Sequence, residues 1–572
     1  MVRHSPTDVP DRPAEELEQR DLVRCVLRRE AFHPLLAEAV AGYLDLLPGG
    51  TRVGIYPPGP AAQALLERHS ASLRRHEPVF ILTDPLGATT FQGFPLVPPA
   101  ALRACPPEAV IILSARFEHE MAAELGFMDP VRVVRPLALL EASGLERVLG
   151  RARDLIADRV EREAARMAAE LPGDRPLVLF LTSHPPHHIV KIMGEAVRQG
   201  FAVAVVAEYP KGTSGDPLGA YVGTGCFHSL YVSRYSLAQE FLALERRLKP
   251  RLVHLETGMD AAQSIARVVA QKTTPAVVEY RDFPQTVFPT EEAAMKAWRL
   301  PPEEYREESD AHRRIFLGAD GIIMKDAPET LDFLSGLYGH RPERVLQFYP
   351  YFSDDLAAPS GGPKLSAVLG EPHIVYAGAV VDAPGWHNYP IYRSLLAAGR
   401  ILADQGIHLT IYNANDPGDG RGFEDYRVLA GVCPYFHYHP ALPYRELKTV
   451  LPRHDFGWLC FDFSQARENP FFHRITMGSK VFTYLEAGLP VLISPEQEFM
   501  ARVVTRDLGS GVPLAFWDLP QLRRILDRQD WTAVHRRIRA AQATWTYRSH
   551  GPRLGAFYHS CAGTRGPGPW SA

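Results

Sequence analysis

The chain has 572 residues, of which 46% are hydrophobic and 22% are charged, and its formal net charge is −4 at pH 7. Such a length exceeds what one hydrophobic core supports and predicts about three or four domains. The composition is that of a globular protein. The acidic balance argues against nucleic-acid binding, which usually requires a basic excess.

The N-terminal stretch "MVRHSPTDVPDRPAEELEQR" is polar and has no apolar core of the signal-peptide type. No apolar run approaches the ~20 residues of a membrane-spanning helix. The six cysteines lie far apart without a C-x-x-C pair, which predicts reduced thiols and neither a zinc site nor a disulfide framework. We therefore expect a cytoplasmic protein without a membrane span, either free or peripheral at the inner membrane surface.

Residues 1–148 predict an N-terminal Rossmann-like accessory domain. After a helical lead-in over residues 22–47, the segment "TRVGIYPPGPAAQALLERHS" predicts a strand, a turn and a helix. The turn keeps Gly54, Gly59 and Ala62 of a dinucleotide fingerprint, but its prolines lack the amides that would bind a pyrophosphate. We expect a degenerate scaffold or recognition domain here rather than a binding site for NAD.

Two further α/β blocks follow a predicted linker helix over residues 149–172. The first block, residues 173–360, opens with "RPLVLFLTSHPPHHIVKIMGEAVRQGFAVAVVAEYP", in which strands alternate with helices. The second block, residues 361–545, opens with "HIVYAGAVVDAPGW" and precedes a Gly/Pro-rich tail over residues 546–572. This alternation predicts parallel sheets covered on both faces. Ligands of such sheets bind at the carboxyl ends of the strands, which predicts a site between the two blocks.

The segment "GSKVFTYLEAGLPVLISPE", residues 478–496, predicts a short helix that stops at Gly488 and Pro490 and leads into a strand. A helix N-terminus presents unpaired N–H groups and partial positive charge, which favour an anion. Ser479 adds a hydroxyl there, and Lys480 adds a positive charge. The alternative interpretation is a routine helix with a solvated lysine.

This segment resembles the part of GT-B glycosyltransferases, especially family 4 and its relatives, that binds the donor diphosphate. In those proteins Ser/Thr-Lys precedes a helix ending in Ala-Gly-x-Pro-Val. The segments "GADGIIMKDAPETLDFL", "VYAGAVV" and "YFHYHPALPYRELKTVLPRHDFGWLCF" resemble other parts of the family in the same order, over about residues 175–560. The resemblance implies an α/β fold with two Rossmann-like lobes of GT-B type, preceded by a third, N-terminal Rossmann-like domain.

The resemblance implies a donor site in the last block. The family usually has a glutamate five residues before the glycine, where its carboxylate binds the ribose, but here that position is Thr483. Glu486, one helical turn later, either takes this role or is a surface residue. The residues expected at the donor diphosphate are Gly378, Arg474, Gly478, Ser479 and Lys480. The residues expected at the donor nucleoside are Asn413, His437, Tyr438, Thr483 and Glu486.

The loop "TSHPPHH" carries His184, His187 and His188 after the first strand of the second block. Three histidines suggest a metal, but no carboxylate or cysteine lies at ligand spacing, so no metal site is expected. The resemblance implies that this loop lies on the acceptor side. Solvated loop histidines are the alternative.

Two further strand ends carry polar residues. The segment "VVEYRDFP" provides Arg281 on the acceptor side and Asp282, which the resemblance places near the donor sugar. An Arg–Asp pair within the loop is the alternative. The segment "VHLETG" provides His254 and Glu256, which form either an acid/base pair or a structural pair. Asp282, His254 and Glu256 are the expected catalytic residues.

The resemblance implies a glycosyltransferase of glycan biosynthesis that moves a sugar from a nucleotide-diphosphate donor to an acceptor hydroxyl, with retention of configuration. The chain has no D-x-D motif, so we expect a site without metal or other cofactor in which Lys480 and helix amides neutralise the diphosphate. The acceptor is a glycan, a lipid-linked compound, a protein or a small molecule. The alternatives are a nucleotide-sugar epimerase of the same fold and a non-catalytic module that binds sugars or partners; a homo-oligomer is left open.

Overall fold

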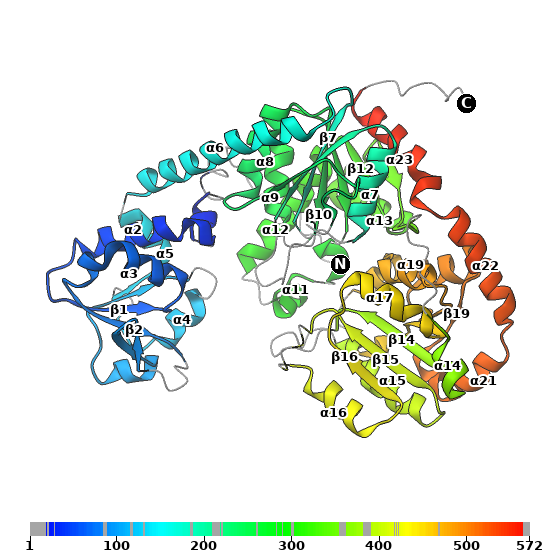
Figure 1. Cartoon of the computed structure of the whole chain (residues 1–572). Helices are drawn as coiled ribbons and strands as arrows, with labels where there is room; N and C mark the ends of the chain where they lie inside the picture. The colour runs from blue at the N-terminus through cyan, green and yellow to red at the C-terminus, as the bar shows by residue number, and fades with distance from the viewer. Residues whose placement is uncertain are drawn as a thin grey trace. The chain divides into compact units, whose positions relative to one another are not determined.

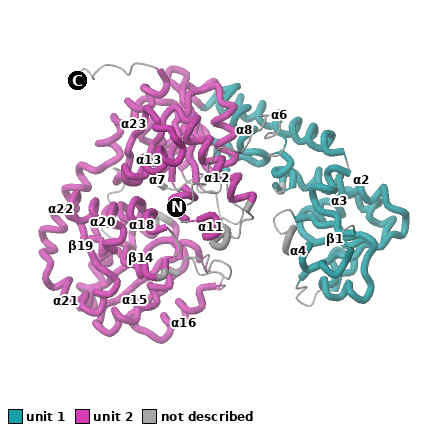
Figure 2. Tube along the Cα trace, turned by 180° about the vertical axis from the view of Figure 1, so that it is seen from behind, with its two compact units in different colours: residues 1–170, 206–209, 231–248 teal, residues 171–205, 210–230, 249–572 magenta. Residues whose placement is uncertain are grey.

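The structure is a computed structural model (Figure 1). It describes residues 19, 22–27, 29–83, 89–114, 118–129, 132–142, 144–183, 187–208, 218, 221–258, 261–281, 283–288, 290–298, 302–353, 362–380, 390–416, 418, 420, 422–466 and 469–563. The chain divides into two compact units (Figure 2). One comprises residues 1–170, 206–209 and 231–248, and the other comprises residues 171–205, 210–230 and 249–572. The finer division expected from the sequence stays a prediction.

The first unit contains a six-stranded sheet of order β3-β4-β2-β1-β5-β6, in which only the β3–β4 pair is antiparallel. Its strands are β1 (Arg52–Tyr56), β2 (Glu77–Ile81), β3 (Thr90–Phe91), β4 (Phe94–Val97), β5 (Ala109–Ile112) and β6 (Val133–Val134). Its helices are α2 (His33–Leu44), α3 (Pro60–Leu73), α4 (Glu118–Glu124), α5 (Pro136–Ala142) and α6 (Leu145–Glu170). The predicted strand, turn and helix at residues 52–73 are confirmed, and Pro60 opens α3 because its fixed φ suits a first helical position.

The second sheet has seven strands in the order β13-β12-β11-β10-β7-β8-β9. These are β7 (Leu177–Thr182), β8 (Ala202–Ala207), β9 (Ser229–Val232), β10 (Leu252–Thr257), β11 (Ala276–Tyr280), β12 (Gly321–Met324) and β13 (Val345–Gln347). Its helices are α7 (His187–Arg198), α9 (Ala262–Gln271), α10 (Pro284–Val287), α11 (Glu291–Trp298), α12 (Pro302–Gly318) and α13 (Pro328–Tyr338). Helix α8 (Leu237–Leu248), which follows β9, belongs to the first unit. β7, β10, β11, β12 and β13 pair in parallel. All of them except the edge strand β13 are almost wholly buried, as expected for strands covered on both faces. We call this sheet and its helices the middle lobe.

The third sheet has six parallel strands in the order β16-β15-β14-β17-β18-β19. They are β14 (His373–Gly378), β15 (His408–Asn413), β16 (Phe436–His439), β17 (Phe456–Leu459), β18 (Val491–Ile493) and β19 (Gly511–Pro513). The surrounding helices are α14 (Leu365–Leu369), α15 (Ser394–Ala403), α16 (Glu424–Val432), α17 (Tyr444–Val450), α18 (Pro470–Ile475), α19 (Ser479–Glu486), α20 (Glu498–Arg502), α21 (Leu522–Asp527) and α22 (Trp531–Thr544). We call this the C-terminal lobe. The expected α/β fold with two Rossmann-like lobes is confirmed by these parallel sheets.

The chain passes between the two lobes twice, and the two passages lie side by side. Phe352 N donates to Trp545 O at 2.9 Å, and Tyr547 N donates to Phe352 O at 3.0 Å. After the second passage, helix α23 (Tyr547–Cys561) packs against α7 and β11 of the middle lobe (Figure 1). Most of the segment expected as a tail is therefore a packed helix of the middle lobe.

Glycine permits the close approach of α23 to α7. A Cβ atom on Gly551 would overlap the carboxylate of Glu195, which is fully buried. That carboxylate accepts hydrogen bonds from Arg198 Nε and Gln199 Nε2, each at 2.7 Å. The side chain has few ways to move aside, because its bonds fix it inside the lobe.

We expect Gly551→Ala to lower the free energy of unfolding by about 1–3 kcal/mol, the usual cost of overpacking a close contact. Urea unfolding followed by circular dichroism measures this change. The matched control is Gly336→Ala in α13, where no atom lies within 4 Å of the added Cβ. Alanine is the better helix former, so the control should gain up to about 1 kcal/mol. Equal stability of the two variants would contradict the tight α23–α7 contact.

Candidate functional site

The carboxyl ends of β10 and β11 place polar side chains next to one another in the middle lobe. His254 and Glu256 lie two residues apart on β10 and therefore on the same face of the sheet. Glu279 of β11 is in register with Glu256. All three residues are buried although their types are usually exposed, so each needs a polar partner.

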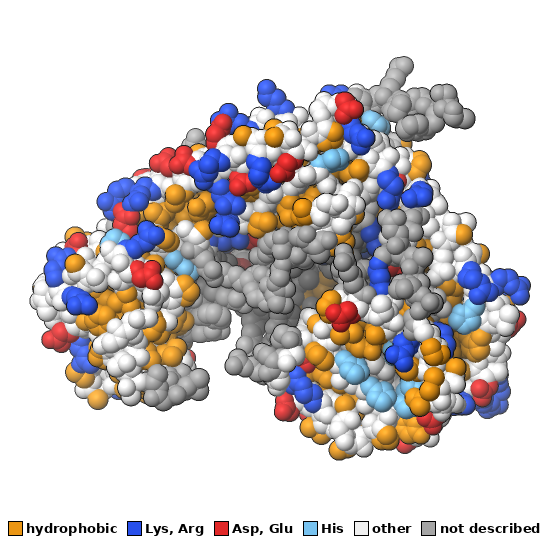
Figure 3. Space-filling view, viewed as in Figure 1, with side chains coloured by type: hydrophobic (Ala, Val, Ile, Leu, Met, Phe, Trp, Pro, Cys, Tyr) orange, Lys and Arg blue, Asp and Glu red, His pale blue; other side chains and the backbone are white. Residues whose placement is uncertain are grey.

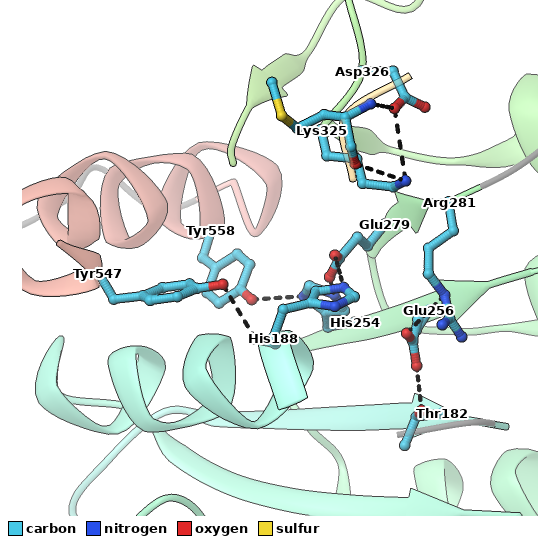
Figure 4. A network of polar contacts seen from close by, with 11 residues as sticks. Thr182, His188, His254, Glu256, Glu279, Arg281, Lys325, Asp326, Tyr547 and Tyr558 are labelled. Carbon is cyan, nitrogen blue, oxygen red and sulfur yellow. Dashed lines mark hydrogen bonds and ion pairs between the residues drawn. The ribbon is translucent and has the colours of Figure 1, made fainter. Parts of the chain in front are cut away.

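These partners form a continuous row through the lobe (Figure 4). Tyr558 of α23 and His254 Nδ1 are 2.6 Å apart, and His254 Nε2 lies 3.2 Å from Glu279 Oε2. His188 Nε2, at the start of α7, lies 2.9 Å from Glu279 Oε1. One carboxylate therefore orients two imidazole rings, and of the two only His188 has exposed surface, with 12% of its side chain accessible.

The two histidines determine the charge of Glu279. Burial by itself favours the neutral carboxyl, but the attraction and hydrogen bonds of His188 and His254 outweigh it and hold the pKa of Glu279 far below its ordinary value. Glu279 is therefore an anion at neutral pH. The hydrogen bond to this buried anion fixes the orientation of the His188 ring.

Glu256 is held differently. Its side chain has no exposed surface, and burial raises its pKa, an effect that the nearby Arg281 partly offsets. Arg281 Nε lies 3.0 Å from Glu256 Oε1, and Thr182 Oγ1 donates to Glu256 Oε2. Arg281 keeps 21% of its side chain exposed. The partly exposed polar groups at this edge thus include His188 and Arg281. The buried Glu256 holds the Arg281 side chain through their ion pair.

The expected catalytic roles remain predictions. His254 and Glu256 lie inside the lobe and have no exposed surface, so substrate contact would require movement of their surroundings. Asp282 and His184 lie outside the described residues. His187 is the first residue of α7, and its side chain also lies outside the described part.

In the C-terminal lobe, α19 starts at Ser479, directly after Gly478, and Gly488 follows its end with φ of +74°. The predicted end of this helix before Gly488 is confirmed, whereas Ser479 and Lys480, expected directly before the helix, are its first two residues. The aliphatic stem of Lys480 lies so close to Gly378, the last residue of β14, that a Cβ there would overlap it. The structure thus brings Gly378, Gly478, Ser479 and Lys480 together, and their expected role at a diphosphate stays a prediction.

Lys480 is in an unusual electrostatic position. Burial lowers the pKa of its ammonium group, and the positive charge of Lys325 in the middle lobe lowers it further. Its Nζ lies 5.8 Å from the centre of the Tyr376 ring. Among the described residues, no carboxylate forms an ion pair with Lys480. A lysine whose charged form is disfavoured in this way would gain from an incoming anion.

The other residues expected at the diphosphate and ribose have partners within the protein. Arg474 is exposed, and its Nε lies 3.0 Å from Glu498 Oε1. Glu486 is held between the lobes, because Lys191 Nζ donates to its Oε1 at 2.6 Å and Ser353 N donates to the same atom at 2.8 Å. Thr483 Oγ1 donates to Ser479 O at 3.4 Å. The carboxylate of Glu486 therefore already has two donors.

The residues expected at the nucleobase fall into two groups. Asn413 Nδ2 donates to Tyr438 OH at 2.9 Å, and Asn413 Oδ1 accepts from Val380 N at 2.9 Å, just after β14. His437 belongs to a different group, with its Nε2 at 2.9 Å from His408 Nδ1. The ring of His408 stacks on that of His373 with 4.1 Å between centroids. Figure 3 shows histidine side chains gathered on this face of the lobe. The structure thus separates His437 from Asn413 and Tyr438.

Sequence reasoning missed Lys191, Lys325, Asp326 and Tyr558. Lys325 directly follows β12, so its place at a strand end could have been found by the rule that was applied to Glu256 and Arg281. Tyr558 lies 304 residues from His254 in a segment expected to be a tail, and no local pattern could have joined them.

Within the described residues, no group of three His, Cys, Asp or Glu side chains is arranged to hold a metal ion. In the same part of the chain, no helix combines the length and the apolar character required to cross a membrane.

No family model matches the chain, and no curated protein matches its sequence. Several solved structures are similar in their backbone. HepE from Anabaena in complex with UDP-glucose is 13% identical, covers 67% of this chain and 98% of its own, and gives a TM-score of 0.48. The α,α-trehalose 6-phosphate synthase of Burkholderia multivorans is 12% identical, with coverages of 68% and 99% and a TM-score of 0.44.

MnaA from S. aureus, solved with UDP, is 11% identical, covers 69% of this chain and all of its own, and gives a TM-score of 0.43. At such TM-scores and identities, the likeness does not identify a family, a reaction or a substrate for this chain.

We expect Glu279→Gln to lower the free energy of unfolding at pH 7 by about 3 kcal/mol, because it removes the charge from a buried pair. The folded-state pKa of Glu279 is depressed below its ordinary 4.5, so the carboxylate stabilises the fold above pH 4.5 and loses this effect as the pH falls. The variant should therefore show a shallower loss of stability between pH 5 and pH 3 than the parent protein. Urea unfolding at a series of pH values measures both effects.

The control for this prediction is Glu291→Gln, which removes an exposed pair with Arg306 at 3.0 Å. It should cost less than about 1 kcal/mol and leave the acid dependence unchanged. A Glu279→Gln profile that superimposes on the control would refute the buried anion.

Glu486 is predicted both as a nucleoside ligand and, from the structure, as an interlobe contact. If the contact with Lys191 is the only role of Glu486, Lys191→Met and Glu486→Gln should each weaken nucleoside diphosphate binding by the same small factor. The double variant should then bind little more weakly than either single variant. If it binds the nucleoside, Glu486→Gln alone should lose tenfold or more. Isothermal titration calorimetry of the double-mutant cycle separates the two outcomes.

Proposed function

We propose that the chain is a glycosyltransferase that moves a sugar from a nucleotide-diphosphate donor to an acceptor hydroxyl. The observation that carries the proposal is Lys480. It follows the first residue of α19, lies against Gly378 at the end of β14, and has no carboxylate partner among the described residues. A cation in that position, together with the amides of the first turn of α19, fits a diphosphate.

The diphosphate is the leaving group of the proposed reaction. When the bond between the sugar and the donor phosphate breaks, negative charge grows on the departing diphosphate. Lys480 and the N–H groups of the first turn of α19 are oriented before that charge develops, which lowers the barrier. Cationic side chains and amides supply this stabilisation by themselves, so the proposal needs no metal ion.

The acceptor hydroxyl is assigned to the strand ends of the middle lobe. The partly exposed His188 and Arg281 are supported by Glu279 and Glu256, and both can contact a hydroxyl or a sugar. For the retaining course implied by the family resemblance, the departing phosphate itself takes the proton of the acceptor, and His188 then orients the hydroxyl. Asp282 remains the candidate closest in sequence to Arg281.

The cluster of three titratable side chains, His188, His254 and Glu279, also suits a nucleotide-sugar epimerase. Such an enzyme needs acids and bases near the sugar but no acceptor. Incubation with a nucleotide sugar and an acceptor panel separates the reactions. Diphosphate release that depends on acceptor supports transfer. Conversion of one nucleotide sugar into another without acceptor identifies the epimerase, and absence of binding leaves a module without this activity.

We expect Lys480→Ala to weaken nucleoside diphosphate binding at least tenfold, because a charge-assisted contact to phosphate is lost. Calorimetric titrations of the parent protein with UDP, GDP, ADP, CDP and dTDP first identify the preferred base. The same titration of the variant with the preferred nucleoside diphosphate then measures the effect. Lys272→Ala is the control, since Lys272 pairs with Asp320 elsewhere in the middle lobe. Unchanged affinity of the Lys480 variant would count against the proposed donor site.

A further inference from the structure

The loop after β12 in the middle lobe is bonded to the segment that leads into α19 of the C-terminal lobe. Asp326 Oδ1 accepts from Met477 N at 2.8 Å, and Ala327 N donates to Ile475 O at 2.8 Å. Lys325 Nζ donates to Met477 O at 3.2 Å (Figure 4). Three contacts thus hold three successive residues of one lobe against the backbone that precedes Gly478.

These contacts place Lys325 near the N-terminus of α19. Met477 lies three residues before Lys480, and the ammonium group of Lys325 binds its carbonyl oxygen. Most of the Lys325 side chain is buried, with 16% exposed. After burial, the positive charge of Lys325 is the second cause of the lowered pKa of Lys480. Two ammonium groups, one from each lobe, therefore belong to the region around the start of α19.

Asp326 is the carboxylate closest in sequence to this pair, and its geometry directs it to the backbone. Its Oδ1 accepts from Met477 N and lies 3.7 Å from Lys325 Nζ, beyond the range of a hydrogen bond. Asp326 is 6% exposed, so its position is fixed. We assign it to positioning the segment before α19, and its ion pair with Lys325 offsets part of the charge of that lysine.

Two cations in a partly buried place are stabilised by an anion; Asp326 does this in part for Lys325, whereas no carboxylate among the described residues pairs with Lys480. A single phosphate is matched by Lys480 with the amides of α19. A diphosphate carries more charge and spans further, and a second cation suits it. Lys325, from the opposite lobe, binds the backbone just before α19, whereas Lys191 pairs with Glu486 at the other end of that helix.

We propose that Lys325 is a second ligand of the donor diphosphate, so that one lysine from each lobe binds the two linked phosphoryl groups. This inference rests on the proposed function, because it deepens the assignment of the same site. The diphosphate then bridges the lobes, and its binding energy depends on the contact between the β12–α13 loop and residues 475–477. The nucleoside itself gains nothing from Lys325.

The test compares Lys325→Met, which keeps the length of the side chain without its charge, with Lys325→Arg, which keeps the charge. We expect the methionine variant to bind the preferred nucleoside diphosphate at least tenfold more weakly, and to bind the corresponding nucleoside as the parent protein does. The arginine variant should recover most of the affinity. Thermal unfolding of each variant identifies any loss of the fold, and Lys272→Met controls for the general loss of one positive charge.

Inorganic pyrophosphate is the second probe, because it contains the two phosphoryl groups without the nucleoside. Pyrophosphate binding that falls tenfold in Lys325→Met supports the inference, even if no nucleoside diphosphate binds and the proposed function fails. Nucleoside diphosphate binding that is lost in Lys480→Ala but unchanged in a folded Lys325→Met overturns the inference and leaves the proposed function standing. A parent protein that binds neither probe overturns both.

Discussion

The pairing of Phe352 with Trp545 and Tyr547 is the constraint on which the two-lobed unit depends. It brings the outgoing and returning passages of the chain together and forms a short bridge between the two lobes. The return places α23 on the middle lobe, where Tyr558 reaches His254. The same bridge ends close to Ser353, whose amide holds Glu486 of α19. Elements of both candidate half-sites thus take their position from this bridge.

The two halves of the candidate site differ in the sign of their buried charge. The middle lobe contains a buried anion, Glu279, which is hydrogen-bonded to His188 and His254. At the start of α19 lie two cations among the described residues, Lys480 and Lys325, and the charge of Lys325 lowers the pKa of Lys480 further than burial alone does. The first arrangement is complete without a ligand, whereas the second gains from one. This difference is the physical reason for placing the anionic part of a substrate at α19 and a neutral hydroxyl near His188.

The sequence was sufficient for features that depend on local pattern. The parallel strands follow from apolar runs between helices, and the bounds of α19 follow from Gly478 at its start and Gly488 beyond its end. It was insufficient where partners come from distant segments. Glu486 was expected at a ribose because of its place on one helix, yet its partner Lys191 lies 295 residues away. His437 and Tyr438 are neighbours in sequence but point to opposite faces of β16. The two side chains therefore cannot both belong to the one nucleoside-binding group that was expected from the sequence.

The packing of α23 has a consequence for how the protein is made. Synthesis runs from the N-terminus, and domains generally fold as units while the chain emerges. Here the last helix of the middle lobe is encoded after the entire C-terminal lobe, and Tyr558 must arrive before the ring of His254 has its partner. The middle lobe is therefore completed only after the whole C-terminal lobe has been synthesised, because α23 is its last helix.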